Sequence, residues 1–263
     1  MKAEDEQKVN QVILLLSNKT TKELINNYKA ISRATEKKGD TFLLYHLNDA
    51  KLPAEIKDLP HFVFTDNVLT KLNYTPISNS LIPGNNHFPL LEFYLNNPIY
   101  DYYWCIEDDV RFTGDWQYFF NSFARVNKDF ISSYVSVYFE NIRWPWWPSL
   151  VHPSILIPNE NRIKSFNPIY RISRKALDFI HNALINHWSG HHEVLLPTLL
   201  YQSGYEIMDF GGTGRFVIPG NENKFYINKT TNTEGPSDGT MRWRPIFKSQ
   251  GKIKNKLYHP VKE

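Results

Sequence analysis

The sequence predicts an α/β protein with an open mixed β-sheet flanked by helices, and three observations carry this prediction. Continuous apolar runs alternate with segments of helical periodicity along the first hundred residues. Polar residues follow the apolar runs, as they do at the carboxyl ends of strands in open α/β sheets. The chain has 263 residues and is 41% hydrophobic, which is enough apolar material for the core of a single domain.

The first half of the chain shows the alternation most clearly. Residues 12–16 form a continuous apolar run that ends on Ser17 and Asn18, which predicts a strand covered on both of its faces. Residues 21–36 carry apolar side chains at helical spacing and precede a glycine stop signal, so they predict a helix. Residues 41–47 are a second apolar run that closes on polar residues, and they predict the second strand.

Two further strands and a second helix follow. Residues 61–64 are a short apolar run that ends in a Thr-Asp pair, and they predict the third strand. A helical pattern covers residues 88–94 and runs up to an Asn-Pro stop. Residues 102–106 are again apolar and predict a fourth strand, which three acidic residues follow directly. This order of elements predicts a sheet whose strand ends carry the polar chemistry.

The second half of the chain is less regular. Residues 131–139 and 205–210 are strand-like, and residues 174–185 form an amphipathic helical pattern. Residues 194–201 predict a short helix that a glycine closes. Residues 144–148 read Trp-Pro-Trp-Trp-Pro, which predicts a proline-punctuated aromatic loop.

Composition excludes several classes of protein. Thirty basic and 27 acidic side chains leave a net charge of +3, which does not indicate a surface for duplex nucleic acid, so we expect no nucleic-acid partner. The single cysteine, Cys105, excludes an internal disulfide and a multi-thiolate zinc site. The amino-terminal residues are charged and precede only a short apolar run, so we expect no signal peptide, no membrane span and a cytoplasmic protein.

The sharpest chemical signal is the acidic triplet Glu107, Asp108 and Asp109 at the end of the fourth predicted strand. Side chains alternate along a strand, so Glu107 and Asp109 share one face and Asp108 points to the other. Two carboxylates on one face repel each other unless a cation or a hydrogen-bond donor lies between them. Hard oxygen ligands select Mg²⁺ or Mn²⁺, so we expect a metal site. The alternative is that these acids cap a turn or pair with Arg111.

An apolar strand followed by Glu-Asp-Asp resembles the Asp-x-Asp motif of nucleotide-sugar-dependent glycosyltransferases of the GT-A fold. The resemblance rests on this triplet and on the order of elements over residues 10–215. It implies a Rossmann-like GT-A domain at residues 1–247, with a donor half at residues 10–115 and an acceptor half at residues 116–247. Residues 248–263 are expected to be a basic carboxyl-terminal extension on the surface.

The resemblance also implies a set of metal ligands. By position in the motif, Asp109 binds a divalent ion, Mn²⁺ or Mg²⁺, that bridges the donor diphosphate. Asp108 faces the sugar or the ribose, and Glu107 is a water-mediated partner of the metal. His259 resembles the late histidine that many GT-A enzymes use as an additional metal ligand, although a histidine near a terminus is also commonly a solvated surface residue.

A catalytic base is implied further along the chain, in the segment Ser-Gly-His-His-Glu at residues 189–193. Inverting GT-A enzymes resemble this layout and place the general base there, which makes Glu193 the candidate and puts His192 near the acceptor. A zinc-protease motif is excluded because Leu195 and Leu196 stand four residues after the two histidines. The alternative is that Glu193 only stabilises the first helical turn, whose field lowers its basicity unless burial by Trp188 offsets the effect.

Substrate contacts are expected at both ends of the site. Donor contacts are expected from polar residues at strand and loop ends, although such residues are also ordinary in turns: Ser17, Asn18, Asp49 and Asn86. Trp146 and Trp147 are expected to offer a rigid surface to acceptor sugar rings, with core packing as the alternative. The lysines of the carboxyl-terminal extension either contact anionic lipid headgroups or are simply solvated.

Taken with the resemblance, these residues predict a metal-dependent, inverting glycosyltransferase of hexosyl or N-acetylhexosaminyl type. The donor is a nucleoside-diphosphate sugar, the acceptor is a glycan or lipid-linked hydroxyl, and the expected process is bacterial-type surface polysaccharide synthesis. Two alternatives stay open. One is an inactive protein that binds nucleotide sugars or carbohydrates. The other is a metal-dependent phosphohydrolase, which needs a second cluster of ligands that the sequence does not show.

Overall fold

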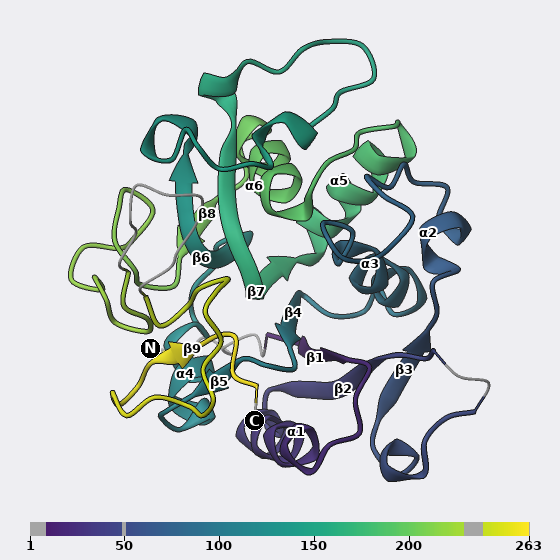
Figure 1. Ribbon diagram of the computed structural model, residues 1–263, viewed down its shortest axis with the longest axis vertical. Coiled ribbons are helices and arrows are strands. Elements are labelled where there is room, and N and C mark those ends of the chain that lie inside the picture. The colour runs from purple at the N-terminus through teal and green to yellow at the C-terminus, as the bar shows by residue number, and fades with distance from the viewer. Residues whose placement is uncertain (1–8, 49–50, 229–238, 263) are drawn as a thin grey trace, which may run out of the picture.

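The computed structural model describes residues 9–48, 51–228 and 239–262, which form three layers of α, β and α structure (Figure 1). The strands are β1 (Gln11–Ser17), β2 (Gly39–His46), β3 (His61–Phe64), β4 (Tyr102–Glu107), β5 (Arg111–Phe112), β6 (Phe130–Val137), β7 (Ile163–Ser173), β8 (Ile207–Asp209) and β9 (Leu257–Tyr258). The helices are α1 (Lys22–Thr35), α2 (Val68–Lys71), α3 (His87–Asn96), α4 (Trp116–Ser122), α5 (Arg174–Ile185) and α6 (His192–Gln202). Four short 3-10 turns in the described residues are η1 (Ala54–Ile56), η2 (Tyr138–Glu140), η3 (Trp147–Ser149) and η4 (Asn159–Asn161).

The central sheet has seven strands in the order β3-β2-β1-β4-β7-β6-β8. The first four are parallel, so the carboxyl ends of β1 and β4 meet at one edge, where Leu16 pairs with Glu107. Strand β1 is almost wholly buried, in agreement with its continuous Val-Ile-Leu run. The predicted fold class, an open mixed sheet flanked by helices, is confirmed.

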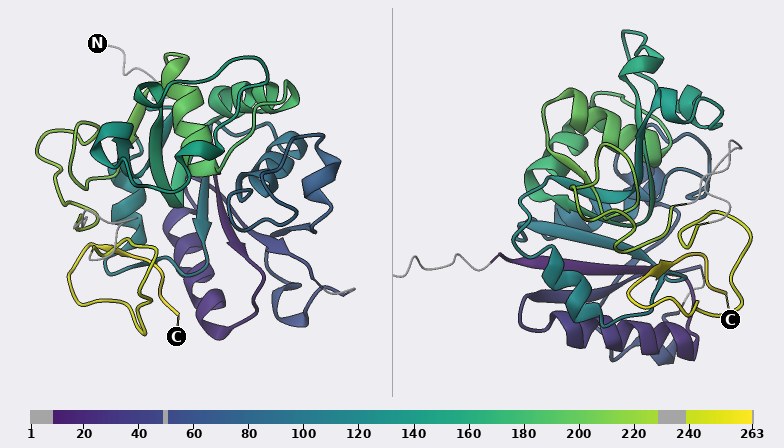
Figure 2. Two further views of the ribbon diagram at one scale, coloured as in Figure 1. Left: turned by 45° about the horizontal axis from the view of Figure 1, so that its top comes forward. Right: turned by 90° about the vertical axis from the view of Figure 1, so that its left-hand side faces the viewer.

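Helices cover both faces of the sheet (Figure 2). Helices α1 and α4 pack on one face, and α3, α5 and α6 pack on the other, so each face has its own apolar core. Helix α1 begins where the side chain of Thr21 accepts a hydrogen bond from the Leu24 amide (3.2 Å), and it buries Leu24, Tyr28 and Ile31.

The longest strand, β7, is absent from the sequence prediction. It pairs antiparallel with β4 on one side and with β6 on the other, and all eleven of its residues are buried. Its sequence mixes polar and apolar residues and contains Asn167-Pro168, a pair that usually marks a turn. Helix α4 is also absent from the prediction, whereas the strands and helices that were predicted all have counterparts. The strand predicted at residues 131–139 ends at Val137, where η2 begins.

The carboxyl-terminal segment returns to the body of the protein. Strand β9 pairs antiparallel with β5, and Figure 1 shows this yellow segment beside β5 and α4. Leu257, Tyr258 and Val261 are buried. The expectation of a surface extension is therefore wrong for residues 257–261, because Leu257 belongs to the apolar core next to β5 and its neighbours are buried as well.

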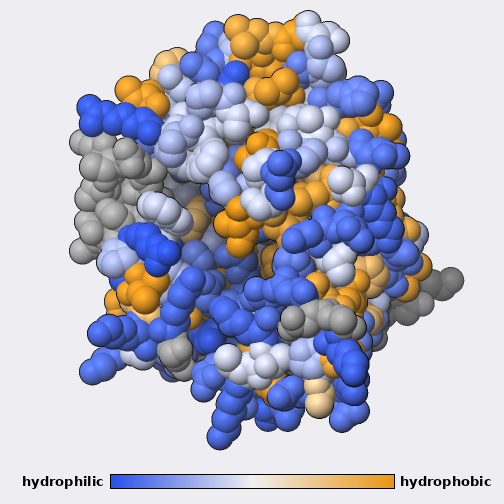
Figure 3. Space-filling model, turned by 45° about the vertical axis from the view of Figure 1, so that its right-hand side comes forward, coloured by the Kyte–Doolittle hydropathy of each residue, from blue (hydrophilic) through white to orange (hydrophobic). Residues whose placement is uncertain are grey.

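The surface is uneven in polarity. The segment between β6 and β7 exposes Val151, Ile155 and Leu156. On the face drawn in Figure 3, apolar atoms gather at the upper edge and near the centre, and the lower part is largely hydrophilic. None of the helices in the described part of the chain combines the length and the apolar character that a bilayer crossing requires.

Candidate active site

The three acids that follow β4 separate as strand alternation predicts. Asp108 turns toward β1, where it accepts hydrogen bonds from Ser17 Oγ (2.5 Å) and Lys19 Nζ (2.8 Å). Glu107 and Asp109 turn to the opposite side, toward His259. Ser17 and Asp108 are therefore paired with each other, and in this arrangement they stabilise the turn after β1.

Glu107, Asp109 and His259 converge on one point. Their ligand atoms all lie within 4.8 Å of one another. The Nε2 atom of His259 is 3.2 Å from Asp109 Oδ1 and 3.3 Å from Glu107 Oε2. The structure thus brings together the three residues that the sequence analysis expected at a metal, although they are separated by about 150 positions in the chain.

The pairing of β5 with β9 holds His259 in this position. Arg111 pairs with Tyr258, and the Val261 amide donates to the Asp109 carbonyl (2.8 Å). The Nδ1 atom of His259 lies 2.8 Å from the Arg242 carbonyl, to which it donates, so Nε2 is the nitrogen that faces the carboxylates. A backbone acceptor on one ring nitrogen and an open second nitrogen is the usual arrangement of a metal-ligating histidine.

Charges in this cluster influence one another strongly. Burial lowers the pKa of His259, but the nearby carboxylates of Asp109 and Glu107 outweigh burial and raise the pKa to about 9. Burial raises the pKa of Asp109, but His259, Lys262 and Lys19 together hold it below its ordinary value. Without a metal, the protonated imidazole therefore balances the two carboxylates.

A divalent ion fits the same cluster. Among the described residues, Asp109 Oδ1 is buried and has no hydrogen bond of good geometry, although His259 Nε2 is nearby. Two carboxylates and one imidazole are ligands that Mn²⁺ accepts readily, whereas Mg²⁺ favours an all-oxygen set. Asn86 Nδ2 donates to Glu107 Oε1 (3.1 Å), which orients that carboxylate.

Glu193 lies in the first turn of α6 and is held by the backbone of β7. Its Oε1 atom accepts a hydrogen bond from the Asn167 amide (3.1 Å). Burial raises the pKa of Glu193 to about 7, against the opposing effects of Asn167 and Lys164. The raised pKa is the opposite of the lowered basicity that a position in the first helical turn predicts. Trp188 does not supply this burial as expected, because it packs on His152 and does not line the cavity.

Three buried histidines, His87, His191 and His192, form a group of rings at the start of α6. His191 Nδ1 accepts a hydrogen bond from the Glu193 amide (3.3 Å), and burial lowers the pKa of His191 to about 3. The ring is therefore neutral, and its 3.8 Å approach to Glu193 Oε2 is not an ion pair. Burial also lowers the pKa of His87 to about 3 and that of His192 well below its ordinary value. Two of these neutral rings, those of His191 and His192, line the same cavity as Glu193.

The cluster and Glu193 face the same cavity, whose volume is about 560 Å³. Its polar lining includes Glu107, Asp109, His259, Glu193, Asn86 and His192. Trp144, Trp146 and Phe166 form an apolar side, on which Trp146 stacks against His191 with ring centres 4.7 Å apart. Arg244 and Lys262 add positive charge to the lining.

The remaining predicted contacts lie elsewhere. Trp147 is buried, its indole nitrogen donates to the Asn141 carbonyl (2.7 Å), and it does not line the cavity, so its predicted acceptor contact is wrong. The packing alternative therefore holds for Trp147, because its ring completes the core beside Trp144. Asn18 is exposed at the end of β1, and Asp49 lies outside the described residues. Neither Ser17 nor Asn18 lines this cavity.

Sequence reasoning missed several residues of the site. Asn167 binds Glu193 through its backbone, and Lys164 lies near Glu193, but both belong to the unpredicted strand β7. Arg244 and Lys262 stand in irregular segments with no local pattern. No local signal marks Lys164 or Asn167, because the sequence of β7 mixes polar and apolar residues and does not predict a buried strand.

Comparisons with known proteins give one family model and many solved structures of low sequence identity. The model of a family described as "Protein of unknown function (DUF3405)" matches residues 29–130. No curated protein has a sequence significantly similar to this chain. Among solved structures, a glycosyltransferase involved in the glycosylation of the major capsid of PBCV-1 is similar with a TM-score of 0.33 and 10% identity. The match covers 65% of this chain and 63% of that one. A putative glucose-1-phosphate thymidylyltransferase from Bacillus anthracis, solved in complex with a sucrose, is similar with a TM-score of 0.40 and 8% identity, over 78% of this chain and 88% of that one.

Proposed function

We propose that this protein is a metal-dependent glycosyltransferase of the GT-A type that uses a nucleoside-diphosphate sugar as donor. The observation that carries the proposal is that one cavity joins a carboxylate–imidazole cluster to a buried carboxyl with a pKa of about 7. This cavity lies beyond the carboxyl end of β4, where open α/β sheets bind nucleotides.

The proposed donor side is the cluster and its positive neighbours. Glu107, Asp109 and His259 would hold Mn²⁺ or Mg²⁺, which supplies Lewis-acid stabilisation of the diphosphate leaving group. Arg244 and Lys262 line the same cavity and would bind phosphate oxygens by charge-assisted hydrogen bonds. Lys262 Nζ is already within 3.7 Å of Asp109 Oδ2, which places its charge beside the cluster.

The proposed acceptor side is Glu193. The Asn167 amide fixes one carboxylate oxygen, which leaves the other free to take the proton of an acceptor hydroxyl as that oxygen attacks the anomeric carbon. A base with a pKa near the working pH combines a large ionised fraction with useful basicity. Attack from the face opposite the leaving group predicts inversion. Trp146 would stack on an acceptor sugar ring, and the acceptor is proposed to be a glycan or lipid-linked hydroxyl.

The two alternatives differ in what they need. A phosphohydrolase with two metals requires a second ligand cluster, and the described residues show one cluster of three or more potential ligands. An inactive binding protein has no need for a buried carboxyl with a raised pKa beside the metal site. The transferase proposal uses both features.

The experiment combines metal and donor. Thermal unfolding is followed with a panel of UDP, GDP, CDP and dTDP, each with Mn²⁺, with Mg²⁺ or with EDTA. We expect one nucleotide to raise the melting temperature only when the metal is present. Donor hydrolysis or transfer is then measured with the sugars of that nucleotide. Nucleotide binding that ignores the metal, or metal-dependent binding without any turnover on a broad acceptor panel, would reject the proposal.

A further inference from the structure

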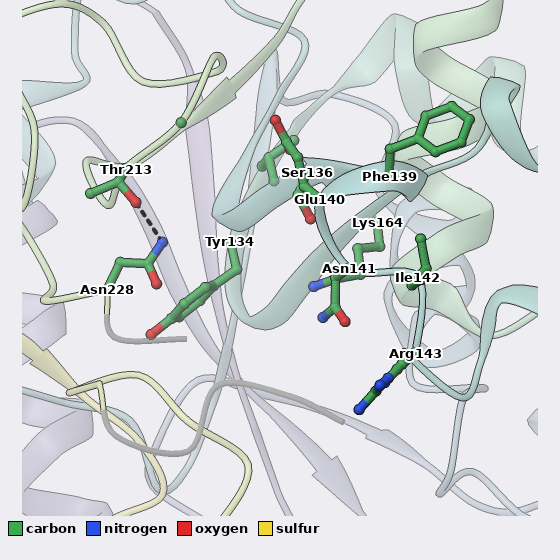
Figure 4. Close-up of a pocket in the computed structure, with 12 residues that line it drawn as sticks. Tyr134, Ser136, Phe139, Glu140, Asn141, Ile142, Arg143, Lys164, Thr213 and Asn228 are labelled. Atoms are coloured by element: carbon green, nitrogen blue, oxygen red, sulfur yellow. Dashed lines mark hydrogen bonds between the residues drawn. The ribbon is translucent and has the colours of Figure 1, made fainter. Parts of the chain in front are cut away.

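A second cavity lies beside the candidate active site, with a volume of about 500 Å³ (Figure 4). The segment from β6 to η2 and the loop after it form one side of this cavity, and Thr213 and Asn228 form the other. In Figure 4, Lys164, Asn141 and Arg143 lie together, opposite Thr213 and Asn228, with Tyr134 between the two groups. Most of these side chains offer hydrogen-bond donors, and Tyr134 and Phe139 add aromatic faces. Glu140 also lines the cavity, and its carboxylate is paired with Arg215, whose Nε is 3.3 Å from Oε1.

Lys164 is the unusual residue of this cavity. It belongs to the buried strand β7 and is only 4% exposed, yet among the described residues no carboxylate lies within ion-pair distance of its Nζ atom. The centre of the Trp144 ring is 5.5 Å from Nζ. Burial lowers the pKa of Lys164 to about 8, against the opposing effects of Glu193, Glu140 and Asp209, so the amine is still mostly charged at neutral pH. A buried cation without a direct ion pair is unfavourable for folding, which indicates a use for its charge.

The second cavity adjoins the first where Lys164 meets Trp144. Lys164 and Phe166 lie on the same face of β7, because side chains two apart in a strand point the same way. Phe166 and Trp144 line the first cavity, and Lys164 and Arg143 line the second. The Lys164–Trp144 contact therefore marks the boundary between them. A molecule that extends from Glu193 over Trp144 would enter the second cavity at Lys164.

We propose that the second cavity is an acceptor subsite that binds a sugar carrying an anionic group, a carboxylate or a phosphate, at Lys164 and Arg143. Arg143 is exposed and supplies a planar pair of donors, which suits either anion. Asn141, Ser136 and Thr213 would bind the hydroxyl groups of the ring. The role as acceptor subsite depends on the function proposed above, but the binding of an anionic sugar does not.

Binding is tested without donor and in EDTA, so that the result is independent of catalysis. The probes are methyl β-D-glucuronide, glucose 6-phosphate and the neutral methyl β-D-glucoside, with dissociation constants from NMR titration. We expect at least one anionic probe to bind at least tenfold more tightly than the neutral one. The identity of that probe decides between carboxylate and phosphate. Equal binding of all three would overturn the proposal.

Variants locate the effect. Lys164→Met should reduce the preference for the anionic probe at least tenfold and leave binding of the neutral probe unchanged. The control is Lys128→Met, which replaces a partly exposed lysine paired with Glu206. If Lys164→Met does not fold, the exposed Arg143→Glu carries the test, with the same loss expected. A preference that survives in Lys164→Met or in Arg143→Glu would reject the subsite.

The transferase proposal and the subsite proposal can be rejected independently of each other. Asp109→Asn should bind the anionic probe as the wild type does, since the probe does not touch the metal cluster. Anion-selective binding without metal-dependent transfer rejects only the transferase. Metal-dependent transfer without anion selectivity rejects only the subsite. If Lys164 merely balances the charge of Glu193, Lys164→Met shifts the pH profile of transfer without changing the preference for anionic probes, and that outcome also rejects the subsite.

Discussion

Under the proposed function, His259 has two alternative partners, a proton and a metal ion. Either one would lie between Glu107 and Asp109, because Nδ1 is committed to the Arg242 carbonyl and only Nε2 is open. The two carboxylates that raise the pKa of His259 to about 9 are the same groups that would attract a cation. Proton and metal therefore compete for a single position.

This competition predicts that metal affinity depends on pH. We expect the Mn²⁺ association constant to rise by up to tenfold per pH unit below about pH 9, because His259 must lose its proton before it binds. His259→Ala should weaken Mn²⁺ binding by at least tenfold and flatten this dependence. Isothermal titration calorimetry between pH 6 and pH 8 measures both. An unchanged slope in the variant would mean that another group controls binding.

Glu193 is the second residue whose ionisation matters. Its pKa of about 7 is raised above the ordinary value, so the carboxyl is protonated and inactive as a base below neutral pH. We expect kcat/KM for transfer to fall tenfold per pH unit below about pH 7 and to level off above it. Glu193→Gln should lower transfer by about 10² to 10⁴ fold while Mn²⁺ binding is retained. Steady-state kinetics over pH 5.5 to 9 test the expected fall of kcat/KM at low pH. Transfer near the wild-type rate in Glu193→Gln would exclude Glu193 as the base.

At the scale of elements, the pairing of β5 with β9 brings His259 next to Glu107 and Asp109, although it is far from them in the sequence. β5 follows the acidic triplet almost directly, so a strand that pairs with it is placed beside Glu107 and Asp109. Leu257 is fully buried in the core beneath this pair, and it anchors the segment that carries His259. The stability of the site therefore depends on a two-residue strand and its core contacts.

Removing this anchor should affect stability and metal binding together. Leu257→Ala is expected to lower the free energy of unfolding by about 2 to 5 kcal/mol, since it leaves a cavity in a packed core. It should also weaken Mn²⁺ binding, because His259 loses its support. The control is Ile253→Ala, an exposed residue of the same segment. Urea denaturation and Mn²⁺ titration provide the readouts, and full Mn²⁺ affinity in Leu257→Ala would contradict this view of β9.

At the scale of the whole molecule, buried neutral histidines set a limit to acid stability. His87 is nearly inaccessible, and both of its ring nitrogens have no hydrogen-bond partner among the described residues. Burial, with a smaller effect of His191, lowers its pKa to about 3. A lowered pKa means that the folded state resists protonation, so this contribution to stability is complete above pH 6.5 and is lost as the pH falls toward 3.

We therefore expect the free energy of unfolding to depend less on acid in His87→Leu than in the wild type. Between pH 6.5 and pH 4.5, the wild type should lose about 2 to 3 kcal/mol more than the variant, because one proton is taken up on unfolding. Glu193 has the opposite effect on stability, since its raised pKa favours the folded state at low pH. Both the wild type and His87→Leu contain Glu193, so the informative quantity is the difference between their losses of unfolding free energy. Urea denaturation at the two pH values measures it, and parallel losses would show that His87 does not titrate as proposed.

Local patterns predicted more of the first half of the fold than of the second. Strands β1 to β4 and helix α1 have strong periodicity, since each buries a continuous or one-sided apolar surface. The sequence pattern does not predict β7, because this strand contains polar residues that normally indicate exposure. Those side chains are buried only because they find hydrogen-bond partners in the folded protein, where β4 and β6 pair with the strand on both sides. Ser165 and Asn167, for example, bind each other inside the strand. Trp147 was misplaced for the same reason, because sequence alone does not distinguish a core indole from one that meets a sugar.

Strand periodicity over a few residues is enough to predict the α/β class, the acidic end of β4 and the separation of Asp108 from Glu107 and Asp109. Two features are visible only in the folded chain: β9 pairs with β5 and places His259 between the two carboxylates, and β7 brings Lys164 and Asn167 beside Glu193. Contacts between residues far apart in the chain leave no local pattern, since they arise from the packing of whole elements. The raised pKa of Glu193 belongs to the same class, because burial by distant segments produces it.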